Sequence, residues 1–280
     1  MDVSIIFVNY NTYKLTIEAI ASVYEFTKKI NFEIIVVDNN SKDNSVDQIK
    51  NKFPDVVIIR NVKNIGFGRA NNKGMKIAKG KYFFLLNTDT YLISNAIELF
   101  FDFMEEKENS TVAVVGGQLY KPNGGYSVSY GPFPNFKLFV KGSFWRYFYK
   151  KKFYINEVVI PVKEDFIIPY EVDYVSGADF FIRREIINKT KGFNESFFMY
   201  FEETELSLRI KKIVYNAKIM ILPQAKIVHI GQGSTLKSIK NKKFKLLYLK
   251  SKSLYFKFQN GYRACVMVYL RGLMTIFFNR

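Results

Sequence analysis

The sequence predicts an α/β protein with a mostly parallel central sheet flanked by helices, followed by a basic helical extension. Short apolar runs typical of buried strands alternate with amphipathic stretches typical of helices from residue 1 to about residue 116. Alternation of this kind builds a parallel sheet whose crossover helices cover its faces. The chain has 280 residues, of which 48% are hydrophobic, so it can form one large domain with a sizeable core.

Each element of the first half follows from its own residue pattern. The predicted strands are short runs rich in Val, Ile, Phe and Leu, at 3–8, 33–37, 56–59, 82–86 and 112–116. The predicted helices between them end near residues 26, 52, 79 and 106. Asn is a residue type that caps helices, so we expect Asn11 to begin the first of these helices.

The second half is less regular. A loop-rich region at 120–172 interrupts the alternation and contains an aromatic and basic stretch at 133–154. Regular structure resumes as a predicted strand at 174–182, helices at 184–188 and 202–214, and a strand at 218–222. We therefore expect a body at 1–235, divided into halves 1–116 and 117–235, and a helical extension at 236–280.

Composition excludes several classes of protein. The single cysteine, Cys265, excludes a disulfide framework and any multi-cysteine zinc or iron–sulfur site. The opening residues lack the basic segment and the long apolar run of a signal peptide. No stretch reaches the roughly 18 uninterrupted apolar residues that predict a transmembrane helix. We therefore expect a cytoplasmic protein.

Charge is distributed very unevenly along the chain. All 25 acidic residues lie at or before Glu205, whereas residues 206–280 contain 16 basic residues and no acid. A balanced body with a strongly basic end predicts an anionic partner at that end. Nucleic acid and an anionic membrane surface are the two candidate partners.

Three polar loops follow predicted strands and contain the first candidate site residues. They are the loop from Asn9 to Asn11, the loop that begins at Asp38, and the loop at 87–90. In open α/β sheets ligands bind at the carboxyl ends of the strands. Asp38 can therefore hydrogen-bond a nucleobase or ribose, or simply begin an Asx-turn. Asp89 in Asn87-Thr88-Asp89 can bind Mg²⁺ or Mn²⁺, or belong to an ordinary turn.

Two further motifs contain titratable side chains. Glu202, Glu203 and Glu205 begin a predicted helix, where they either favour the positive helix end or provide a general base. Helical geometry puts Glu202 and Glu205 on one face and Glu203 on another. His229, the only histidine, is either a core residue beside apolar neighbours or a ligand next to a glycine-rich loop.

The order and spacing of these segments resemble the family-2 inverting glycosyltransferases of the GT-A fold, in the branch that includes rhamnosyltransferases and galactofuranosyltransferases. Seven stretches carry the resemblance, and they are VSIIFVNYN (3–11), IIVVDNNSKDNS (34–45), NVKNIGFGRANNKG (61–74), YFFLLNTDT (82–90), YVSGADFFIRRE (174–185), GFNESFFMYFEETELSLRIKK (192–212) and IVHIGQGST (227–235). They span most of residues 3–235.

The resemblance implies a role for each matching residue. The implied nucleotide-sugar-binding residues are Asn9, Asn11, Asp38, Asp43, Arg69, Asn87 and Thr88. Asp89 and His229 are implied as ligands of Mn²⁺ or Mg²⁺. Glu203 is implied as the catalytic base, with Glu202 as the fallback, because this chain has Glu where the family usually has Asp. Position 87 is Asn rather than Asp, which leaves one fewer charge near the metal.

The resemblance also implies a reaction and a setting. A sugar would pass from a nucleoside-diphosphate donor to a hydroxyl of a glycan acceptor, with inversion and without a covalent sugar–enzyme intermediate. The expected donor is dTDP-L-rhamnose, followed by UDP-galactofuranose or another UDP-sugar. The expected acceptor is a lipid-linked glycan in cell-surface polysaccharide synthesis, which puts the enzyme at the inner face of the cell membrane.

The basic extension and the rival functions complete the predictions. Residues 237–280 contain 11 basic residues interleaved with apolar and aromatic ones, which suits a helix in the interface of an anionic membrane. The alternative is an extension that packs on the body or on a second subunit in a homo-oligomer. A nucleic-acid-binding protein and a sugar-phosphate nucleotidyltransferase are the rival functions. We expect no nucleic-acid partner, because nucleic-acid binding does not explain the acidic motifs.

Overall fold

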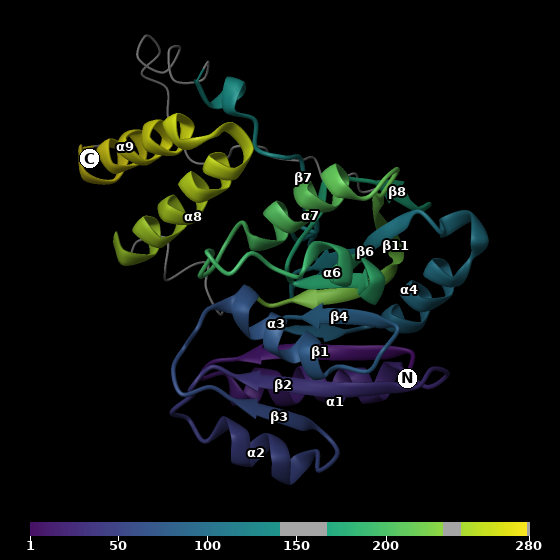
Figure 1. Ribbon diagram of the computed structural model, residues 1–280. Coiled ribbons are helices and arrows are strands. Elements are labelled where there is room, and N and C mark those ends of the chain that lie inside the picture. The colour runs from purple at the N-terminus through teal and green to yellow at the C-terminus, as the bar shows by residue number, and fades with distance from the viewer. Residues whose placement is uncertain (141–166, 232–241, 279–280) are drawn as a thin grey trace.

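The computed structural model describes residues 1–140, 167–231 and 242–278. Most of the aromatic and basic stretch at 133–154 lies outside the described residues, as do Gly233 and Ser234 of the glycine-rich loop and the start of the extension. Within the described ranges the chain forms an α/β body and a helical hairpin at its C-terminal end (Figure 1). The predicted fold class is therefore confirmed.

A mixed sheet of nine strands forms the centre of the body, and eight of them follow the order β3-β2-β1-β4-β10-β6-β11-β5. Its parallel half contains β1 (Val3–Asn9), β2 (Phe32–Asp38), β3 (Val57–Arg60) and β4 (Tyr82–Leu86). Its other half contains β10 (Asp179–Arg183), β6 (Val112–Tyr120), β11 (Lys218–His229) and β5 (Thr90–Leu92). The ninth strand, β8 (Tyr170–Glu171), pairs with β11.

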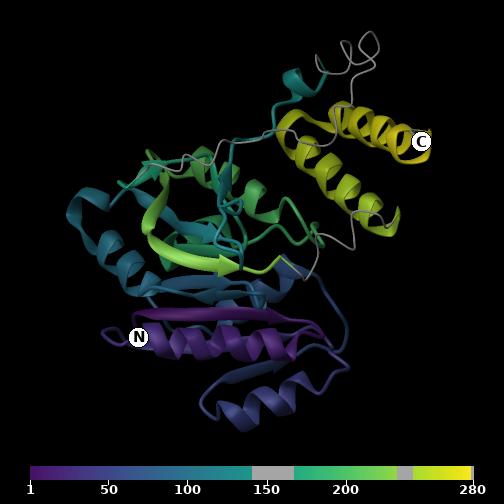
Figure 2. The ribbon, with the colours of Figure 1, turned by 180° about the vertical axis from the view of Figure 1, so that it is seen from behind.

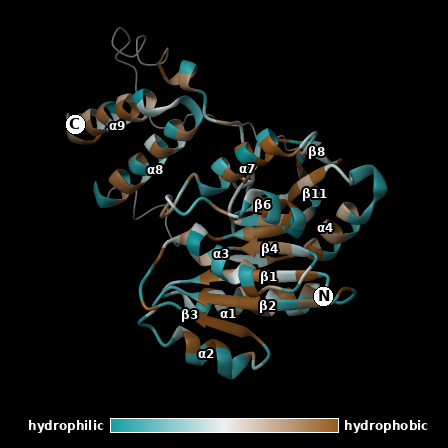
Figure 3. Cartoon of the chain, in the orientation of Figure 1, coloured by the Kyte–Doolittle hydropathy of each residue, from teal (hydrophilic) through white to brown (hydrophobic). Residues whose placement is uncertain are grey.

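Helices cover both faces of this sheet (Figures 1 and 2). One core lies under α1 (Tyr13–Phe26), α2 (Ser45–Lys52) and α4 (Ala96–Glu105). The other lies under α3 (Phe67–Ile77), α6 (Arg184–Thr190) and α7 (Glu202–Ile213). Adjacent strand residues point to opposite faces, so Ile5 belongs to the first core and Ile6 to the second. The central strands are therefore rich in apolar residues, as the brown of β2 and β4 in Figure 3 shows.

Several strand boundaries differ from the sequence predictions. The predicted strand at 174–182 is broken into β9 (Tyr174–Val175), which pairs with β7 (Tyr130–Gly131), and β10. Strand β6 continues to Tyr120, and β11 continues from residue 218 to His229. The register of β11 shifts between Leu222 and Lys226, where Pro223 lies. Proline cannot donate a ladder hydrogen bond, so a bulge there keeps the strand continuous.

The expectation that Asn11 caps the first helix is wrong. Asn11 adopts a left-handed conformation with φ 57°, and α1 begins two residues later. Its N-terminal amide, on Tyr13, instead donates to Asp43 Oδ2 at 3.3 Å. The carboxylate of a loop residue distant in sequence therefore binds this helix end.

The C-terminal helices α8 (Lys242–Asn260) and α9 (Tyr262–Phe278) form a hairpin joined at Gly261. Gly261 has φ +85°, a conformation that favours glycine. A third hydrophobic cluster joins this hairpin to the body through residues Phe197, Phe201, Leu249, Tyr255, Phe256, Ala264 and Val268. The Ser251 hydroxyl also donates to the Met199 carbonyl at 2.7 Å. Within the described parts of the chain, no helix is both long enough and apolar enough to cross a membrane.

Candidate active site

The candidate site lies where the strand order reverses. Strands β2 and β4 lie on either side of β1, and all three run parallel. Their carboxyl ends therefore open at one edge of the sheet, and such a switch point forms a ligand crevice in α/β folds. Asn9 and Asp38 are paired at the ends of β1 and β2, and Asn87 follows β4 directly.

Asn9 organises this edge through its side-chain amide. Its Nδ2 donates to Asp38 Oδ1 at 2.8 Å and to Ser41 Oγ at 2.9 Å. Its Oδ1 accepts from the Thr12 hydroxyl at 3.0 Å and from the Thr16 hydroxyl at 2.8 Å. Asn9 is fully buried, so it orients Asp38 rather than facing a ligand.

Asp38 and Asp43 both stabilise turns in their loop. Asp38 Oδ2 accepts from the Ser41 amide at 3.0 Å, which supports the turn interpretation of Asp38. Asp43 Oδ1 accepts from the Ser45 amide at 3.2 Å, and Asp43 Oδ2 accepts from the first amide of α1. Asn11 is exposed, and its Oδ1 accepts from the Lys42 amide at 2.6 Å. The predicted nucleotide loop is thus held by hydrogen bonds from side chain to backbone.

The Asn87-Thr88-Asp89 segment is connected to both sides of the site. The Asn87 amide donates to the Ala178 carbonyl at 3.0 Å, and the two hydroxyls of Thr88 and Thr12 lie 3.1 Å apart. Asp89 lies next to His229, with His229 Nε2 3.4 Å from Asp89 Oδ1. Strands β5 and β11 fix this approach, because His229 is paired with Thr90. The His229 side chain is 21% exposed, so it is partly accessible at this edge of the sheet.

The acidic start of α7 lies across from that segment, next to the turn between β9 and β10. A Cβ placed on Gly177 would lie 3.7 Å from Glu203 Cγ, so the Glu203 side chain lies beside this turn. Glu203 is half-buried, and burial raises the pKa of its carboxyl, opposed by hydrogen bonds that include Thr204. This position fits a group that takes a proton, because a raised pKa strengthens the conjugate base.

Glu202 and Glu205 are both buried, whereas Glu203 is not, as helical geometry predicted. Burial, and next the charge of Glu203, raise the pKa of Glu202 well above its usual range. Glu202 Oε2 has no hydrogen-bond partner among the described residues. Glu205 is bound by Arg209, with contacts of 2.9 and 2.8 Å, so it is committed to an ion pair inside α7.

The loop before α3 brings a further predicted residue to this side of the molecule. Gly66 has φ +90°, and a Cβ on it would lie 2.3 Å from the Phe198 carbonyl, so only glycine fits there. Gly68 similarly lies against Phe193 and Glu202. The exposed Arg69 guanidinium donates from Nε to the Glu195 carbonyl at 2.6 Å. Arg69 is thus attached to the loop that precedes α7 rather than to the Asp38 loop.

Two residues near the site were not singled out from the sequence. Asp179 is fully buried, its Oδ2 accepts from the Gly117 amide at 2.6 Å, and burial raises its pKa well above the usual range. Tyr174 lies close to Glu203, and burial followed by the Glu203 charge raises the pKa of its hydroxyl. The sequence pattern could have indicated Asp179, because an acidic residue stands in an otherwise apolar strand segment. No comparable pattern distinguishes Tyr174.

The donor set at this edge fits a divalent cation with few protein ligands. Among the described residues no group of three or more His, Cys, Asp and Glu side chains could hold a metal. Asp89 and His229 provide one carboxylate and one imidazole in close contact. Mg²⁺ and Mn²⁺ are commonly bound by one or two protein groups, with substrate phosphates and water as the other ligands.

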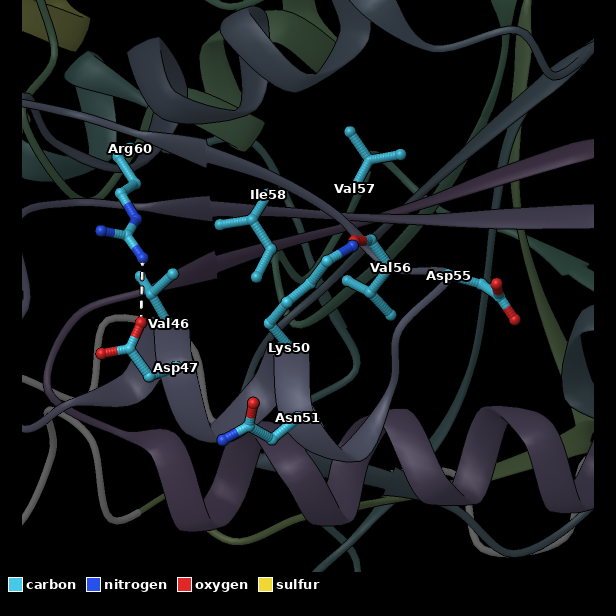
Figure 4. Close-up of a pocket in the computed structure, with 9 residues that line it drawn as sticks. All are labelled: Val46, Asp47, Lys50, Asn51, Asp55, Val56, Val57, Ile58 and Arg60. Atoms are coloured by element: carbon cyan, nitrogen blue, oxygen red, sulfur yellow. Dashed lines mark hydrogen bonds and ion pairs between the residues drawn. The ribbon is translucent and has the colours of Figure 1, made fainter.

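A separate surface groove of about 500 Å³ lies between α2 and the edge strand β3 (Figure 4). Its lining mixes apolar and charged side chains, including Lys50, Asp55 and Ile58. Arg60 and Asp47 form an ion pair of 3.1 Å across it, in which both side chains are largely exposed. None of the predicted site residues lines this groove.

Comparison with known proteins identifies similar chains. Residues 4–190 match the family model described as "Glycosyl transferase family 2". The poly(ribitol-phosphate) beta-glucosyltransferase of Bacillus spizizenii is 37% identical over 114 residues, which is 39% of this chain and 18% of that protein. The UDP-Glc:alpha-D-GlcNAc-diphosphoundecaprenol beta-1,3-glucosyltransferase WfaP of Escherichia coli is 36% identical over 108 residues, which is 38% of this chain and 42% of that protein. The chain thus spans less than half the length of these relatives.

Solved structures show the same fold. S. aureus TarS 1–349 superimposes with a TM-score of 0.58 at 14% identity, covering 99% of this chain and 81% of that chain. The mannosyltransferase PcManGT from Pyrobaculum calidifontis, solved with GDP-Man and Mn²⁺, gives a TM-score of 0.60 at 13% identity. The superposition covers 99% of this chain and 70% of that chain. At these identities the likeness supports the GT-A architecture alone.

Proposed function

The chain belongs to glycosyl transferase family 2, and from this premise we propose that it transfers a sugar from a nucleoside diphosphate to a hydroxyl of a glycan. One observation carries the proposal. Asp38, Asp89 and Glu203 come from separate parts of the chain, yet their loops meet at one edge of the sheet through hydrogen bonds and close contacts. A donor-binding loop, a cation ligand and a base are the groups that this reaction needs.

Glu203 is the proposed base. Its carboxylate takes the proton of the acceptor hydroxyl while that oxygen bonds to the anomeric carbon. The bond from the anomeric carbon to the diphosphate oxygen breaks on the opposite face, and the nucleoside diphosphate leaves. The half-buried position of Glu203 supports this role, because Glu202 is buried and Glu205 is paired with Arg209.

Asp89 and His229 are the proposed ligands of Mn²⁺ or Mg²⁺. The cation would offset the charge of the diphosphate and make it a better leaving group. Asp38, Asn87 and Thr88 are proposed to face the nucleotide side of the donor, with Asn9 and Asp43 holding their loop. Asn11 and Arg69 are exposed, and we propose them as further contacts to the donor.

The proposed donor is a UDP-sugar, with UDP-glucose first. Two of the named relatives are glucosyltransferases, and the name of one contains UDP-Glc. The sequence-based expectation of dTDP-L-rhamnose, and that of UDP-galactofuranose, remain untested predictions. The proposed acceptor is a lipid-linked glycan of the cell surface, because one relative is named for a diphosphoundecaprenol-linked sugar. With such an acceptor, the enzyme would act at the inner face of the membrane.

One experiment tests this function and its rivals together. The full chain is incubated with UDP-glucose, dTDP-L-rhamnose, UDP-galactofuranose, GDP-mannose and CMP-sugars, with Mn²⁺ or with EDTA, and released products are identified by mass spectrometry. We expect release of a nucleoside diphosphate from one donor, dependent on the cation and lost in Glu203→Gln. Release of pyrophosphate would instead identify a nucleotidyltransferase. Protection by DNA or RNA alone, without any donor turnover, would favour the nucleic-acid alternative.

A further inference from the structure

The outward face of α9 is apolar although it faces solvent in the described structure. Val266, Leu270 and Met274 are spaced four residues apart and form one stripe along the helix. Leu270 and Met274 are 55% and 57% exposed. The opposite face of α9 packs on α8, where Ala264 and Val268 are buried in the third cluster. Folding of the hairpin therefore leaves this apolar stripe exposed to solvent.

Basic side chains lie at both ends of this stripe. Residues 242–278 contain six lysines and two arginines and no acidic residue. Arg263 lies seven residues before Leu270 and is therefore on the same face, where it is exposed. Lys242, at the start of α8, lies over the Phe277 ring at 5.4 Å, so positive charge also borders the far end of the stripe.

We propose that this face of α9 docks on an anionic lipid bilayer, with the helix lying in the plane of the interface. Apolar side chains would enter the boundary between headgroups and acyl chains, while basic side chains beside the stripe, such as Arg263 and Lys242, meet acidic headgroups. Charge complementarity favours an anionic bilayer over a second copy of this chain as the partner. Two hairpins whose charged residues are all basic would repel each other. Among the described residues, α9 is not one of the long, strongly apolar helices that could cross a bilayer.

The docking hairpin contacts the catalytic side of the molecule. Tyr248 of α8 lies 5.7 Å from the Tyr200 ring and 5.2 Å from the Phe201 ring. Tyr200 and Phe201 come directly before Glu202 and Glu203 in the chain. A membrane contact at α9 would thus bring a lipid-linked acceptor to the α7 side of the site. This last consequence rests on the proposed function, whereas docking itself does not.

Vesicle sedimentation tests the docking. The full chain is mixed with large unilamellar vesicles of phosphatidylglycerol and phosphatidylcholine at equal amounts, or of phosphatidylcholine alone. We expect binding to the anionic vesicles, which high salt weakens without abolishing, since salt screens only the electrostatic part. The double variant Leu270→Ser/Met274→Ser should bind about tenfold more weakly or worse, because two apolar side chains are lost from the contact.

The matched control is Val62→Ser/Tyr215→Ser, which changes two apolar residues that are 93% and 90% exposed on the body. Its vesicle binding should equal that of the unmodified chain. Unchanged unfolding temperatures would confirm that both double variants fold. The proposal is overturned if the unmodified chain ignores anionic vesicles at low salt, or if Leu270→Ser/Met274→Ser binds as well as the control. It is also overturned if that variant only converts a dimer to a monomer.

Donor hydrolysis without vesicles separates this proposal from the proposed function. Leu270 and Met274 lie on the exposed face of α9, whereas the candidate base lies on α7, so hydrolysis should be the same in the double variant and the unmodified chain. If no donor is hydrolysed, the proposed function fails while the vesicle result still decides the docking.

Discussion

His229 and Asp89 face each other at the end of the β5–β11 pair, with 3.4 Å between His229 Nε2 and Asp89 Oδ1. The pairing of His229 with Thr90 holds the two side chains at this distance. The pairing continues one residue further, because the Ile230 amide donates to the Asp89 carbonyl at 2.8 Å. Backbone pairing thus holds a carboxylate and an imidazole next to each other, as the proposed shared cation would require. The two residues lie far apart in sequence, and the pairing of β5 with β11 brings them together.

Asp89→Asn should therefore weaken cation binding. The change keeps the shape and removes the charge, so we expect transfer to fall by about 10²-fold or more. Binding of Mn²⁺ in the presence of UDP, measured by electron paramagnetic resonance, should weaken as well. Asp55→Asn changes an exposed aspartate in the α2–β3 groove and should have no effect on either measurement. Full activity in excess EDTA would contradict a metal role for Asp89.

Glu203→Gln should separate binding from chemistry. The amide keeps the shape but cannot accept the acceptor proton, so transfer should fall by about 10²–10⁴-fold with donor affinity little changed. Glu202→Gln is the matched variant, because burial already favours the protonated form of Glu202 and an amide resembles it. We expect Glu202→Gln to retain most activity. An inactive Glu202→Gln beside an active Glu203→Gln would identify Glu202 as the base.

The pH dependence of kcat/KM should report the same carboxyl. Burial raises the pKa of Glu203, so the group keeps its proton to a higher pH than an ordinary glutamate. Only the deprotonated form is a base, and activity should therefore fall as pH drops through that raised pKa. A hydrogen bond from Thr204 lowers the pKa of Glu203, so Thr204→Val should move the acid limb to higher pH. An acid limb that does not move in Thr204→Val would assign it to another group.

Except for β5, which was not expected, the strands of the first half could be predicted from the sequence, and so could the positions of the candidate residues. Parallel strands buried on both faces read as continuous apolar runs, and polar residues after them mark the open edge. Asp38, Asp89, His229 and Glu203 accordingly lie at or beside that edge. Their roles in binding and catalysis stay predictions.

Other features depend on contacts that no local pattern contains. Strand β10 lies antiparallel between β4 and β6, and the turn that precedes it contains Gly177, which lies close to Glu203. Asn11 has a typical capping side chain, yet Asp43 reaches the helix end from another loop. The basic charge of the extension was evident from composition. Its packing on Phe197 and Phe201 was not, because a hydrophobic cluster between distant segments leaves no periodic signal.

The buried carboxyl of Asp179 should lower the free energy of unfolding at neutral pH. Its carboxyl is fully buried, Oδ1 has no hydrogen-bond partner among the described residues, and burial raises its pKa well above the usual range. The unfolded chain releases this proton at lower pH than the folded one, so stability falls as pH rises from the unfolded towards the folded pKa. Asp179→Asn should remove this dependence and raise Tm at pH 8 by about 2–4 °C per kcal/mol recovered. An equal change of Tm at pH 4 and pH 8 would contradict the titration of Asp179.

The hairpin of α8 and α9 should support the segment that leads into the base. Tyr200 and Phe201 have positive φ values of 71° and 66°, a backbone strain of about 1–3 kcal/mol each that surrounding packing must hold. Tyr255 is fully buried beside Phe201, with 5.7 Å between the ring centroids. Tyr255→Ala should therefore destabilise the protein by about 3–5 kcal/mol through the cavity it leaves. Hydrogen exchange should speed up at residues 197–203 and transfer should fall.

Tyr255→Phe is the matched variant for this test. The Tyr255 hydroxyl is buried without a hydrogen-bond partner among the described residues, so its removal should leave stability equal or slightly higher. Exchange at 197–203 and transfer should then match those of the unmodified chain. A Tyr255→Ala variant that loses stability in α8 and α9 alone, with unchanged exchange at 197–203, would show that the hairpin folds separately. In that case the base segment would owe its conformation to the body, and removal of residues 236–280 should leave donor hydrolysis intact.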